Sequence, residues 1–332
     1  MITQASTWDS YRPVRPLQAG LCIAAGFALV PAVISTLLRV IPPQEDPSAM
    51  LASFIAYGVV GYLAALFLLL FALRVARRRA VLGGICVVVA ALTALHASWL
   101  APFFLSDHRA ARTPTFTIMS LNLYDGQADP AQVDQVAAKA DVVVLVETTP
   151  EATAGLRRLG WNQRFPYAVG AETLTESDTA IFSRFPLDPG TLIDTSFQQW
   201  MTTVHVPRVG AVRLMAVHPC NPFCGGGHWA SEHAEINRVA QTNLDQPLVL
   251  AGDFNAVDDH GPMQALRRLG IESATDVAGA GWLPTWPADR PYPPLIPIDH
   301  VLISSRLTAT SVTTFAVDGT DHRGLLTTLA GT

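Results

Sequence analysis

Three long runs of apolar residues dominate the first hundred positions of this 332-residue chain. They cover residues 17–41, 50–73 and 80–104, and each could cross about 30 Å of hydrocarbon as a helix. A cleaved signal peptide is the alternative for the first run. That run, however, follows a polar lead, lacks a small-x-small cleavage site at a suitable distance and precedes two further runs. The pattern therefore predicts three transmembrane helices.

Charges beside the runs indicate how the chain is oriented. Arginines precede the first run and follow the second, whereas the intervening loop carries acidic residues. Because cytoplasmic loops are enriched in basic residues, the amino terminus should be cytoplasmic and everything after residue 106 should lie outside. The arginines are Arg12, Arg15, Arg74, Arg77, Arg78 and Arg79, and the acidic residues are Glu45 and Asp46.

Beyond residue 115 the apolar positions form short alternating segments typical of a globular domain. Asp129 and Pro130 begin a predicted helix, and a second helix is expected over residues 228–243. We therefore expect an anchor over 1–105, a linker over 106–114 and an α/β domain over 115–332. Strands are predicted at 117–123, 141–147, 179–182, 202–206, 212–218, 247–254, 298–304 and 311–315.

The composition supports this division into two regions. Half of the residues are apolar, only 15% are charged, and the mean hydropathy is +0.30. A soluble enzyme of this length is ordinarily less apolar. Cys22 and Cys86 lie in apolar runs, whereas Cys220 and Cys224 lie in a Pro/Gly-rich stretch, where an extracytoplasmic disulfide is expected. Two free thiols are the alternative, and zinc binding would lack a second thiol pair.

Polar residues capable of phosphate chemistry gather at the ends of the predicted strands. Carboxylate and amide oxygens are the hard ligands that Mg²⁺ or Mn²⁺ prefers, and histidine adds acid, base or charge-stabilising capacity. The set therefore suits the hydrolysis of a phosphate ester. Its members are Asn122, Glu147, His218, Asp253, Asn255, Asp299, Asp321 and His322.

Six short motifs occur in a characteristic order between residues 115 and 329. They are Leu-Asn-Leu, Val-Glu-Thr, Ala-Val-His-Pro, Gly-Asp-Phe-Asn, Ile-Asp-His and Asp-His-Arg. In order and spacing they resemble the endonuclease/exonuclease/phosphatase superfamily. The resemblance implies a four-layer α-β-β-α sandwich, with an active site where loops cluster at one end of two packed sheets.

The resemblance also implies a metal site. Glu147 resembles the principal metal ligand of the superfamily, and Asn122 a second contributor. Asp321 is similar to the carboxylate that lies beside the metal. The terminal motif Gly-Thr-Asp-His-Arg-Gly departs from the usual Ser-Asp-His, so the loop around this pair is expected to differ.

The remaining five residues match catalytic positions of the superfamily. His322 resembles the catalytic histidine, and Asp299 would orient it and favour the imidazolium. Asp253 would align or deprotonate the attacking water. Asn255 and His218 would donate hydrogen bonds to phosphoryl oxygens.

Several of these positions also have a purely structural reading. Asn122 or Asp299 alone, in a strand-end turn, would more often be a turn residue than a ligand. His300 is expected to be structural, because strand alternation directs it away from the face of Asp299. His233 and His260 are expected to face solvent or to cap helices, as is His228.

The net charge of the predicted α/β domain limits the class of substrate that it is expected to bind. Without the three acidic and seven basic residues of positions 1–105, the 27 acidic and 22 basic residues leave a net charge of −9 on the rest of the chain. Nonspecific nucleic-acid binding uses a basic stripe, so a nuclease is disfavoured. The aromatic and proline-rich stretch before Asp299, with Trp282, Trp286, Tyr292 and Leu295, could be an apolar wall for a lipid-linked substrate or a packed loop.

The layout of three spans and an outer domain is similar to bacterial membrane proteins of the teicoplanin-resistance type. That similarity implies a lipid-linked phosphate or pyrophosphate substrate in the cell envelope, with membrane lipids as surroundings. A membrane-tethered nuclease and a catalytically silent binding or sensor protein are the alternatives. The sequence indicates no protein partner.

Overall fold

The computed structural model describes residues 14–43, 46–76, 79–107, 109–171 and 178–332. The chain forms two compact units, one of residues 1–37 and 55–99 and the other of residues 38–54 and 100–332. The segment that joins the first two apolar runs, residues 38–54, therefore groups with the unit that contains the α/β domain. The two units are described separately.

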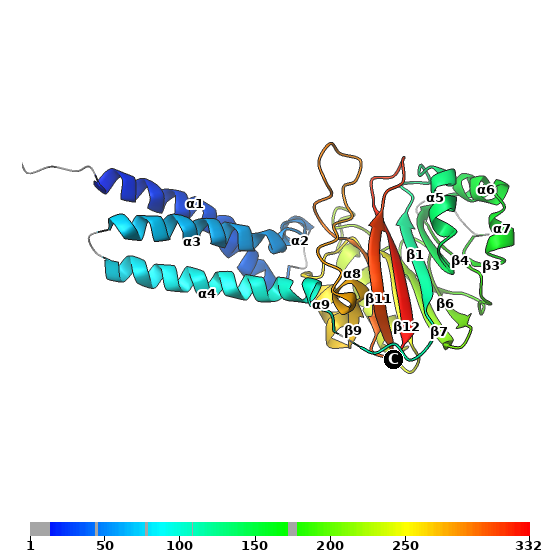
Figure 1. Ribbon diagram of the computed structural model, residues 1–332. Helices are drawn as coiled ribbons and strands as arrows, with labels where there is room; N and C mark the ends of the chain where they lie inside the picture. The colour runs from blue at the N-terminus through cyan, green and yellow to red at the C-terminus, as the bar shows by residue number, and fades with distance from the viewer. Residues whose placement is uncertain (1–13, 44–45, 77–78, 108, 172–177) are drawn as a thin grey trace, which may run out of the picture. The chain divides into compact units, whose positions relative to one another are not determined.

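Three long helices carry the apolar runs: α1 (Val14–Val40), α3 (Gly58–Val75) and α4 (Arg79–Phe104) (Figure 1). By length and composition they can cross a membrane over Pro16–Val40, Ile55–Val75 and Arg79–Phe104. Large side chains such as Phe27 and Phe67 are exposed, whereas the small Ala25 and Ala65 are buried. Helices that associate in lipid show this distribution, because small residues let their backbones approach.

A polar cluster joins the three long helices inside the first unit. The hydroxyl of Thr36 lies 2.6 Å from the Tyr62 hydroxyl and 2.9 Å from Nε2 of His96. His96 is 2% exposed, so its imidazole is satisfied by neighbouring helices. Hydrogen bonds of this kind hold apolar helices together where water is absent.

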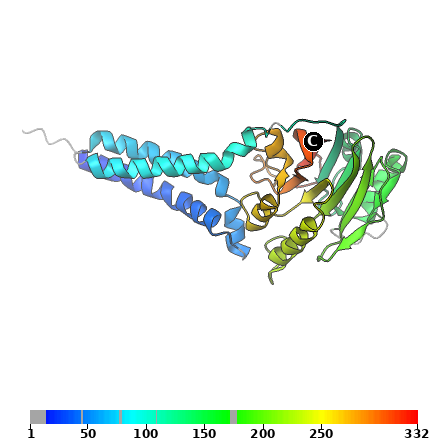
Figure 2. The same ribbon diagram turned by 90° about the horizontal axis from the view of Figure 1, so that it is seen from below.

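The second unit is built on two six-stranded sheets (Figures 1 and 2). The first has the order β11-β12-β1-β2-β4-β3 and the second the order β5-β6-β7-β8-β10-β9. In the first sheet the strands are β1 (Phe116–Asn122), β2 (Val142–Thr148), β3 (Tyr167–Val169), β4 (Asp178–Ser183), β11 (Leu307–Phe315) and β12 (Gly324–Gly331). In the second they are β5 (Thr191–Ile193), β6 (Gln199–Val206), β7 (Gly210–Val217), β8 (Leu248–Asp253), β9 (Ile271–Ser273) and β10 (Asp299–Ser304).

Helices cover the outer faces of the two sheets and complete the predicted four-layer α-β-β-α sandwich. Asp129 and Thr149 cap the first two of these helices by accepting backbone N–H bonds, and a proline follows each cap. Beside the first sheet lie α5 (Pro130–Ala137), α6 (Pro150–Arg158) and α7 (Trp161–Arg164). The others are α8 (His228–Gln241) and α9 (Gly261–Arg268), which pack on the second sheet, and α10 (Ala274–Ala278).

Strand alternation divides the apolar core into three layers. Alternate residues such as Val144 and Val249 face the space between the sheets. Val143 and its equivalents pack under α5, α6 and α7. Leu250 and its equivalents pack under α8 and α9. The inner strands are thus buried on both faces, which explains why strands such as β2 and β8 are almost continuously apolar.

A short helix not anticipated from the sequence, α2 (Asp46–Ala52), lies between the first two apolar runs. Position 50 was predicted to begin the second membrane span, but that candidate span begins at Ile55. Ala49 is fully buried within the core that lies under α8 and α9. Hydropathy alone merges the end of α2 with the following helix, because Met50, Leu51 and Ala52 are apolar.

Candidate active site

The eight residues predicted at strand ends come together at one end of the two sheets. Parallel pairing of β1 and β2 brings Asn122 beside Glu147, and antiparallel pairing of β8 and β10 sets Asp253 opposite Asp299. Three of the eight, Asn122, Asp253 and Asp299, lie behind the pocket lining, and each is hydrogen-bonded to a residue that lines the pocket. The lining residues of the set are Glu147, His218, Asn255, Asp321 and His322.

Asn122 bridges the carboxylates of the two sheets. Its Nδ2 donates to Oε1 of Glu147 at 3.0 Å and to Oδ2 of Asp253 at 3.1 Å. Its Oδ1 accepts from the backbone N–H of Tyr124 at 2.8 Å. Both ends of the amide are therefore engaged in fixing its neighbours, and the predicted metal contact of Asn122 stays a prediction.

Backbone strain concentrates around the pocket. Among the described residues, five other than glycine have a positive φ, and four of these line the pocket: Tyr124, Asp125, Glu147 and Asn255. Such conformations cost of order 1 kcal/mol each and persist where surrounding contacts enforce them. At Glu147, the N–H of Asp125 donates to Oε2 at 2.9 Å and fixes the carboxylate. The strain thus marks the residues whose orientation the fold enforces.

His322 and Asp299 form a buried dyad. Nδ1 of His322 donates to Oδ2 of Asp299 at 2.8 Å, which leaves Nε2 directed elsewhere. Nε2 lies 3.7 Å from Oδ2 of Asp253 and 3.7 Å from Oδ1 of Asp321. The hydroxyl of Thr285 accepts the backbone N–H of Asp299 at 3.2 Å and holds the dyad in place. The expected pairing of His322 with Asp299 is therefore present.

The surrounding carboxylates favour the charged form of this histidine. Burial disfavours the imidazolium, but the charges of Asp299, Asp253 and Asp321 outweigh it and raise the pKa of His322 to about 10. Burial raises the pKa of Asp253, against the opposing effect of His322. Burial likewise raises the pKa of Asp321. The site therefore holds an imidazolium among closely spaced carboxyl groups.

His218 and Asn255 also line the pocket. The ring of His218 stacks on Phe197 with centroids 5.0 Å apart, and its Nε2 lies 3.6 Å from Oε1 of Glu147. Nδ2 of Asn255 donates to the carbonyl of Pro219 at 3.0 Å. A primary amide has a second N–H, so this bond is compatible with a further acceptor.

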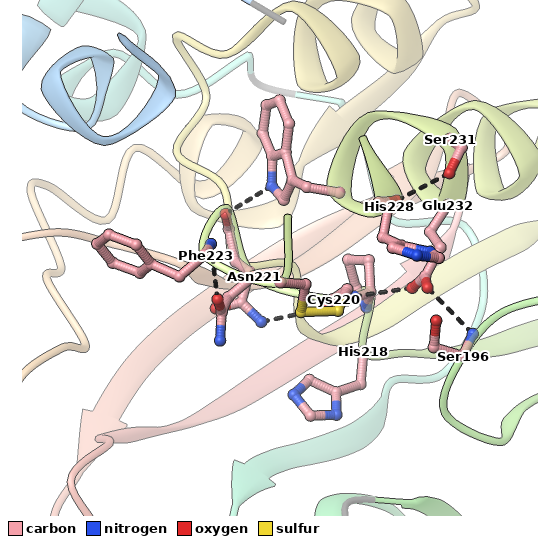
Figure 3. Close-up of a disulfide and its surroundings, with 12 residues drawn as sticks. Ser196, His218, Cys220, Asn221, Phe223, His228, Ser231 and Glu232 are labelled. Atoms are coloured by element: carbon pink, nitrogen blue, oxygen red, sulfur yellow. Dashed lines mark hydrogen bonds between the residues drawn. A yellow bond between two sulfur atoms is a disulfide. The ribbon is translucent and has the colours of Figure 1, made fainter. Parts of the chain in front are cut away.

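A disulfide closes the loop that follows His218. Cys220 and Cys224 are bonded, as expected from their position in the sequence. Figure 3 shows Glu232 on α8 accepting backbone N–H bonds from Cys220 at 2.8 Å and from Ser196 at 3.0 Å. The loop is thereby held to α8, and it presents Phe223, which is 73% exposed, at the pocket.

The pocket has a volume of about 340 Å³, and its lining contains two chemically distinct sets of residues. The polar set includes Glu147, His218, Asn255, Asp321 and His322. The apolar set is Met50, Phe197, Pro222, Phe223, Trp286, Ile296 and Ile298. Small-molecule sites commonly have this volume and this mixture of apolar walls with a few placed polar groups.

The donor set fits a hard divalent cation. Oδ1 of Asp321 is buried and has no hydrogen-bond partner among the described residues. Trp286 fixes the carboxylate by donating from Nε1 to Oδ2 at 3.0 Å. A second group, Asp253, Asp299 and His322, places possible ligand atoms within 4.8 Å of one another. Because His322 and Asp299 are hydrogen-bonded to each other, we favour Asp321 and Glu147 as the metal side.

Three histidines outside the predicted set brace the loop that carries Asn255. Nε2 of His233 lies 3.0 Å from the carbonyl of Phe254, and Nε2 of His300 lies 2.9 Å from that of Ala256. Nδ1 of His260 accepts the N–H of Val257 at 2.9 Å. The structural reading of His300 agrees with this contact. The expectation of solvent-facing or capping roles was wrong for His233, which is fully buried in α8, and His260 is also fully buried.

Of the aromatic stretch before Asp299, only part reaches the pocket. Trp286 lines it and holds Asp321, a role that the sequence did not indicate. Trp282 instead packs against Phe103 with centroids 5.2 Å apart, and Tyr292 is 48% exposed. Of the four residues singled out in the sequence, only Trp286 therefore lines the pocket, together with the nearby Ile296 and Ile298.

The family model of the Endonuclease/Exonuclease/phosphatase family matches residues 119–322. The chain belongs to this family, whose members are hydrolases of phosphodiester or phosphomonoester bonds. The match spans all eight predicted site residues and most of both sheets. No curated protein matches the chain.

Solved structures share the fold at low sequence identity. A Bacteroides vulgatus endonuclease/exonuclease/phosphatase has 14% identity and a TM-score of 0.53, with 66% of this chain and 100% of that chain covered. A mannosyl-6-phosphatase of Bacteroides thetaiotaomicron has 15% identity and a TM-score of 0.51, with 65% of this chain and 99% of that chain covered. D. rerio TDP2 complexed with a single-strand DNA product has 16% identity and a TM-score of 0.50, with 65% of this chain and 98% of that chain covered. At such identities the likeness establishes the fold alone.

Proposed function

We propose that this protein is a membrane-anchored, divalent-metal-dependent phosphoesterase that hydrolyses a lipid-linked phosphate ester or pyrophosphate at the outer face of the membrane. One observation carries the proposal: a single pocket is lined both by His322, Asp321 and Glu147 and by apolar side chains that include Ile296. A phosphate joined to a hydrocarbon chain has the same two parts.

The polar side can bind and activate a phosphoryl group. Nε2 of His322 is charged and directed between two carboxylates, so it can donate to a phosphoryl oxygen. His218 and Asn255 line the same pocket and can donate hydrogen bonds to the other phosphoryl oxygens. Asp253, whose pKa is raised by burial, can accept the proton of an attacking water. Water then forms the new P–O bond as the ester bond breaks.

Glu147 and Asp321 are the residues that would hold Mg²⁺ or Mn²⁺, with Asn122 fixing Glu147 from behind. A bound divalent ion supplies Lewis-acid stabilisation of phosphoryl and leaving-group charge. The bond from Trp286 to Asp321 keeps one carboxylate oxygen occupied and the other available.

The anchor and its orientation rest on the first unit and on charge. Three helices are apolar enough to cross a membrane, and arginines flank the amino-terminal side of the first and the loop after the second. The net negative charge after residue 105 disfavours binding to nucleic acid, which is a polyanion. It is more compatible with a lipid substrate whose phosphate charge is screened by a bound cation.

Purified full-length protein in detergent tests the proposal. Phosphate release would be measured with Mg²⁺ or Mn²⁺ on polyprenyl pyrophosphate, phospholipid and DNA, for wild type, His322→Ala and the control His205→Ala. His205 is a half-exposed histidine on β6 that ion-pairs with Asp188. Release from a lipid substrate, lost only in His322→Ala, supports the proposal. Cleavage of DNA alone indicates the tethered nuclease, and inactivity on every substrate indicates the silent sensor.

A further inference from the structure

Residues 46–54 connect two candidate membrane spans, yet they belong to the same compact unit as the active site. Ala49 at the middle of α2 is fully buried in the apolar core under α8 and α9. Directly after it in the sequence, Met50 and Ser53 line the pocket that contains Glu147 and His322. The segment is therefore a wall of the active site as well as a connection between helices.

Two polar contacts seat this segment. Nε2 of His260 donates to the carbonyl of Ala49 at 2.8 Å. The tautomer follows from the other ring nitrogen, since Nδ1 accepts the N–H of Val257 and cannot itself carry a proton. Before the segment, Arg39 at the end of α1 pairs with Asp259 at 2.7 Å. The two contacts attach α2 and the chain before it to the loop that follows Asp253 and Asn255.

The covalent chain limits how far this wall can lie from the candidate spans. Five residue steps separate Met50 from Ile55, where the second candidate span begins. A fully extended chain covers at most about 3.5 Å per residue, so Met50 lies within roughly 18 Å of that point. A short tether therefore joins the pocket wall at Met50 to the segment that begins the second candidate span.

We infer that α2 is a substrate-positioning segment, in which Met50 contacts the hydrocarbon chain of a membrane-resident phosphate ester whose phosphate lies beside His322 and His218. This inference rests on the proposed function and adds the part of the chain that selects the substrate. Met50 is partly buried, and its flexible thioether side chain adapts to an alkyl or prenyl chain. Phe223 and Ile296 are further apolar residues that line the same pocket.

Steady-state kinetics test the inference with two substrates that differ only in their chains, dodecyl phosphate and ethyl phosphate. Met50→Gln should lower kcat/KM for dodecyl phosphate about tenfold, if contact with the chain buries on the order of 50 Å² of apolar surface. It should leave ethyl phosphate unchanged. Leu51→Gln is the matched control, because Leu51 is the next residue of α2, is 60% exposed and does not line the pocket.

An equal fall for both substrates in Met50→Gln would show a merely structural segment and overturn the inference while leaving the phosphoesterase intact. No change for either substrate would overturn it as well. Failure of wild type to hydrolyse either ester would count against the proposed function, and a binding measurement then decides the inference separately.

That binding measurement is protection of an introduced thiol. Met50→Cys and Leu51→Cys would be alkylated with a maleimide, and modification at each position would be followed by peptide mass spectrometry, which separates them from free Cys22 and Cys86. Dodecyl phosphate should slow alkylation at position 50 but not at position 51, and inorganic phosphate should slow neither. Equal rates at position 50 with and without dodecyl phosphate would contradict the inference.

Discussion

Replacement of Asp299 by asparagine isolates the electrostatic contribution of the dyad, because the two side chains have nearly the same shape. Oδ2 of Asp299 accepts from Nδ1 of His322 at 2.8 Å, and both side chains are at most 5% exposed. Asparagine removes the charge that most strongly favours the imidazolium. An amide can also donate to Nδ1 and impose the other tautomer.

The expected loss can be estimated from these contacts. Each unit by which the pKa of His322 falls corresponds to about 1.36 kcal/mol between its two protonation states. Removing the orienting carboxylate of a catalytic histidine in a comparable dyad lowers kcat by about 10⁴. We expect a fall in kcat of about 10³ to 10⁴ for Asp299→Asn. The melting temperature should fall moderately without loss of the fold, because one partner of a buried charged pair is removed while Asp253 and Asp321 still face the imidazolium.

The assay is phosphate release at saturating Mn²⁺, with the melting temperature measured on the same preparations. Asp245→Asn provides the matched control, since Asp245 is a mostly exposed carboxylate that pairs with Arg213 at 3.4 Å. Wild-type kcat in Asp299→Asn would refute the reasoning. A low kcat accompanied by a collapse of the melting temperature would show that Asp299 is needed for folding rather than for orienting the histidine.

Three further predictions follow from single contacts. Trp286→Phe keeps the apolar wall but removes the 3.0 Å bond to Asp321, so activity should need about tenfold more Mn²⁺, and an unchanged Mn²⁺ titration would contradict this. Burial lowers the pKa of His233 to about 3, so the folded state resists its protonation. The free energy of unfolding should therefore fall by about 1.4 kcal/mol per pH unit as pH drops below 6.5. In His233→Gln the melting temperature should depend less steeply on pH than in wild type, and the same dependence in both proteins would contradict the prediction. Replacing Cys220 and Cys224 together by serine should cost ~2 kcal/mol by chain entropy and lower activity, and an unchanged denaturant midpoint and rate would argue against a role for the loop.

Much of the sandwich was accessible from sequence because its strands are buried on both faces. Continuous apolar stretches such as those of β2 and β8 follow from that burial and are easily recognised. β12 was missed, although it lies between β11 and β1 in the first sheet. Its threonines and terminal glycines weaken the apolar pattern, and only pairing with both neighbours reveals it as a strand.

The site was predictable where a motif fixes a residue at the end of a strand, as for Glu147 and Asp253. The contacts that hold the site were not predictable, because they come from segments distant in sequence. Trp286 reaches Asp321 across 35 positions, and His260 reaches Ala49 across 211. Neither residue type nor local spacing signals such a contact. The same limitation concealed α2, which hydropathy merged with the second span.

The most direct test of the central claim is metal-dependent phosphate release from a polyprenyl pyrophosphate by purified full-length protein, compared with His322→Ala. We expect release that requires Mg²⁺ or Mn²⁺, is abolished by chelation and disappears in the variant. Release that persists in His322→Ala, or hydrolysis of DNA in preference to every lipid substrate, would contradict a lipid-directed phosphoesterase centred on this histidine.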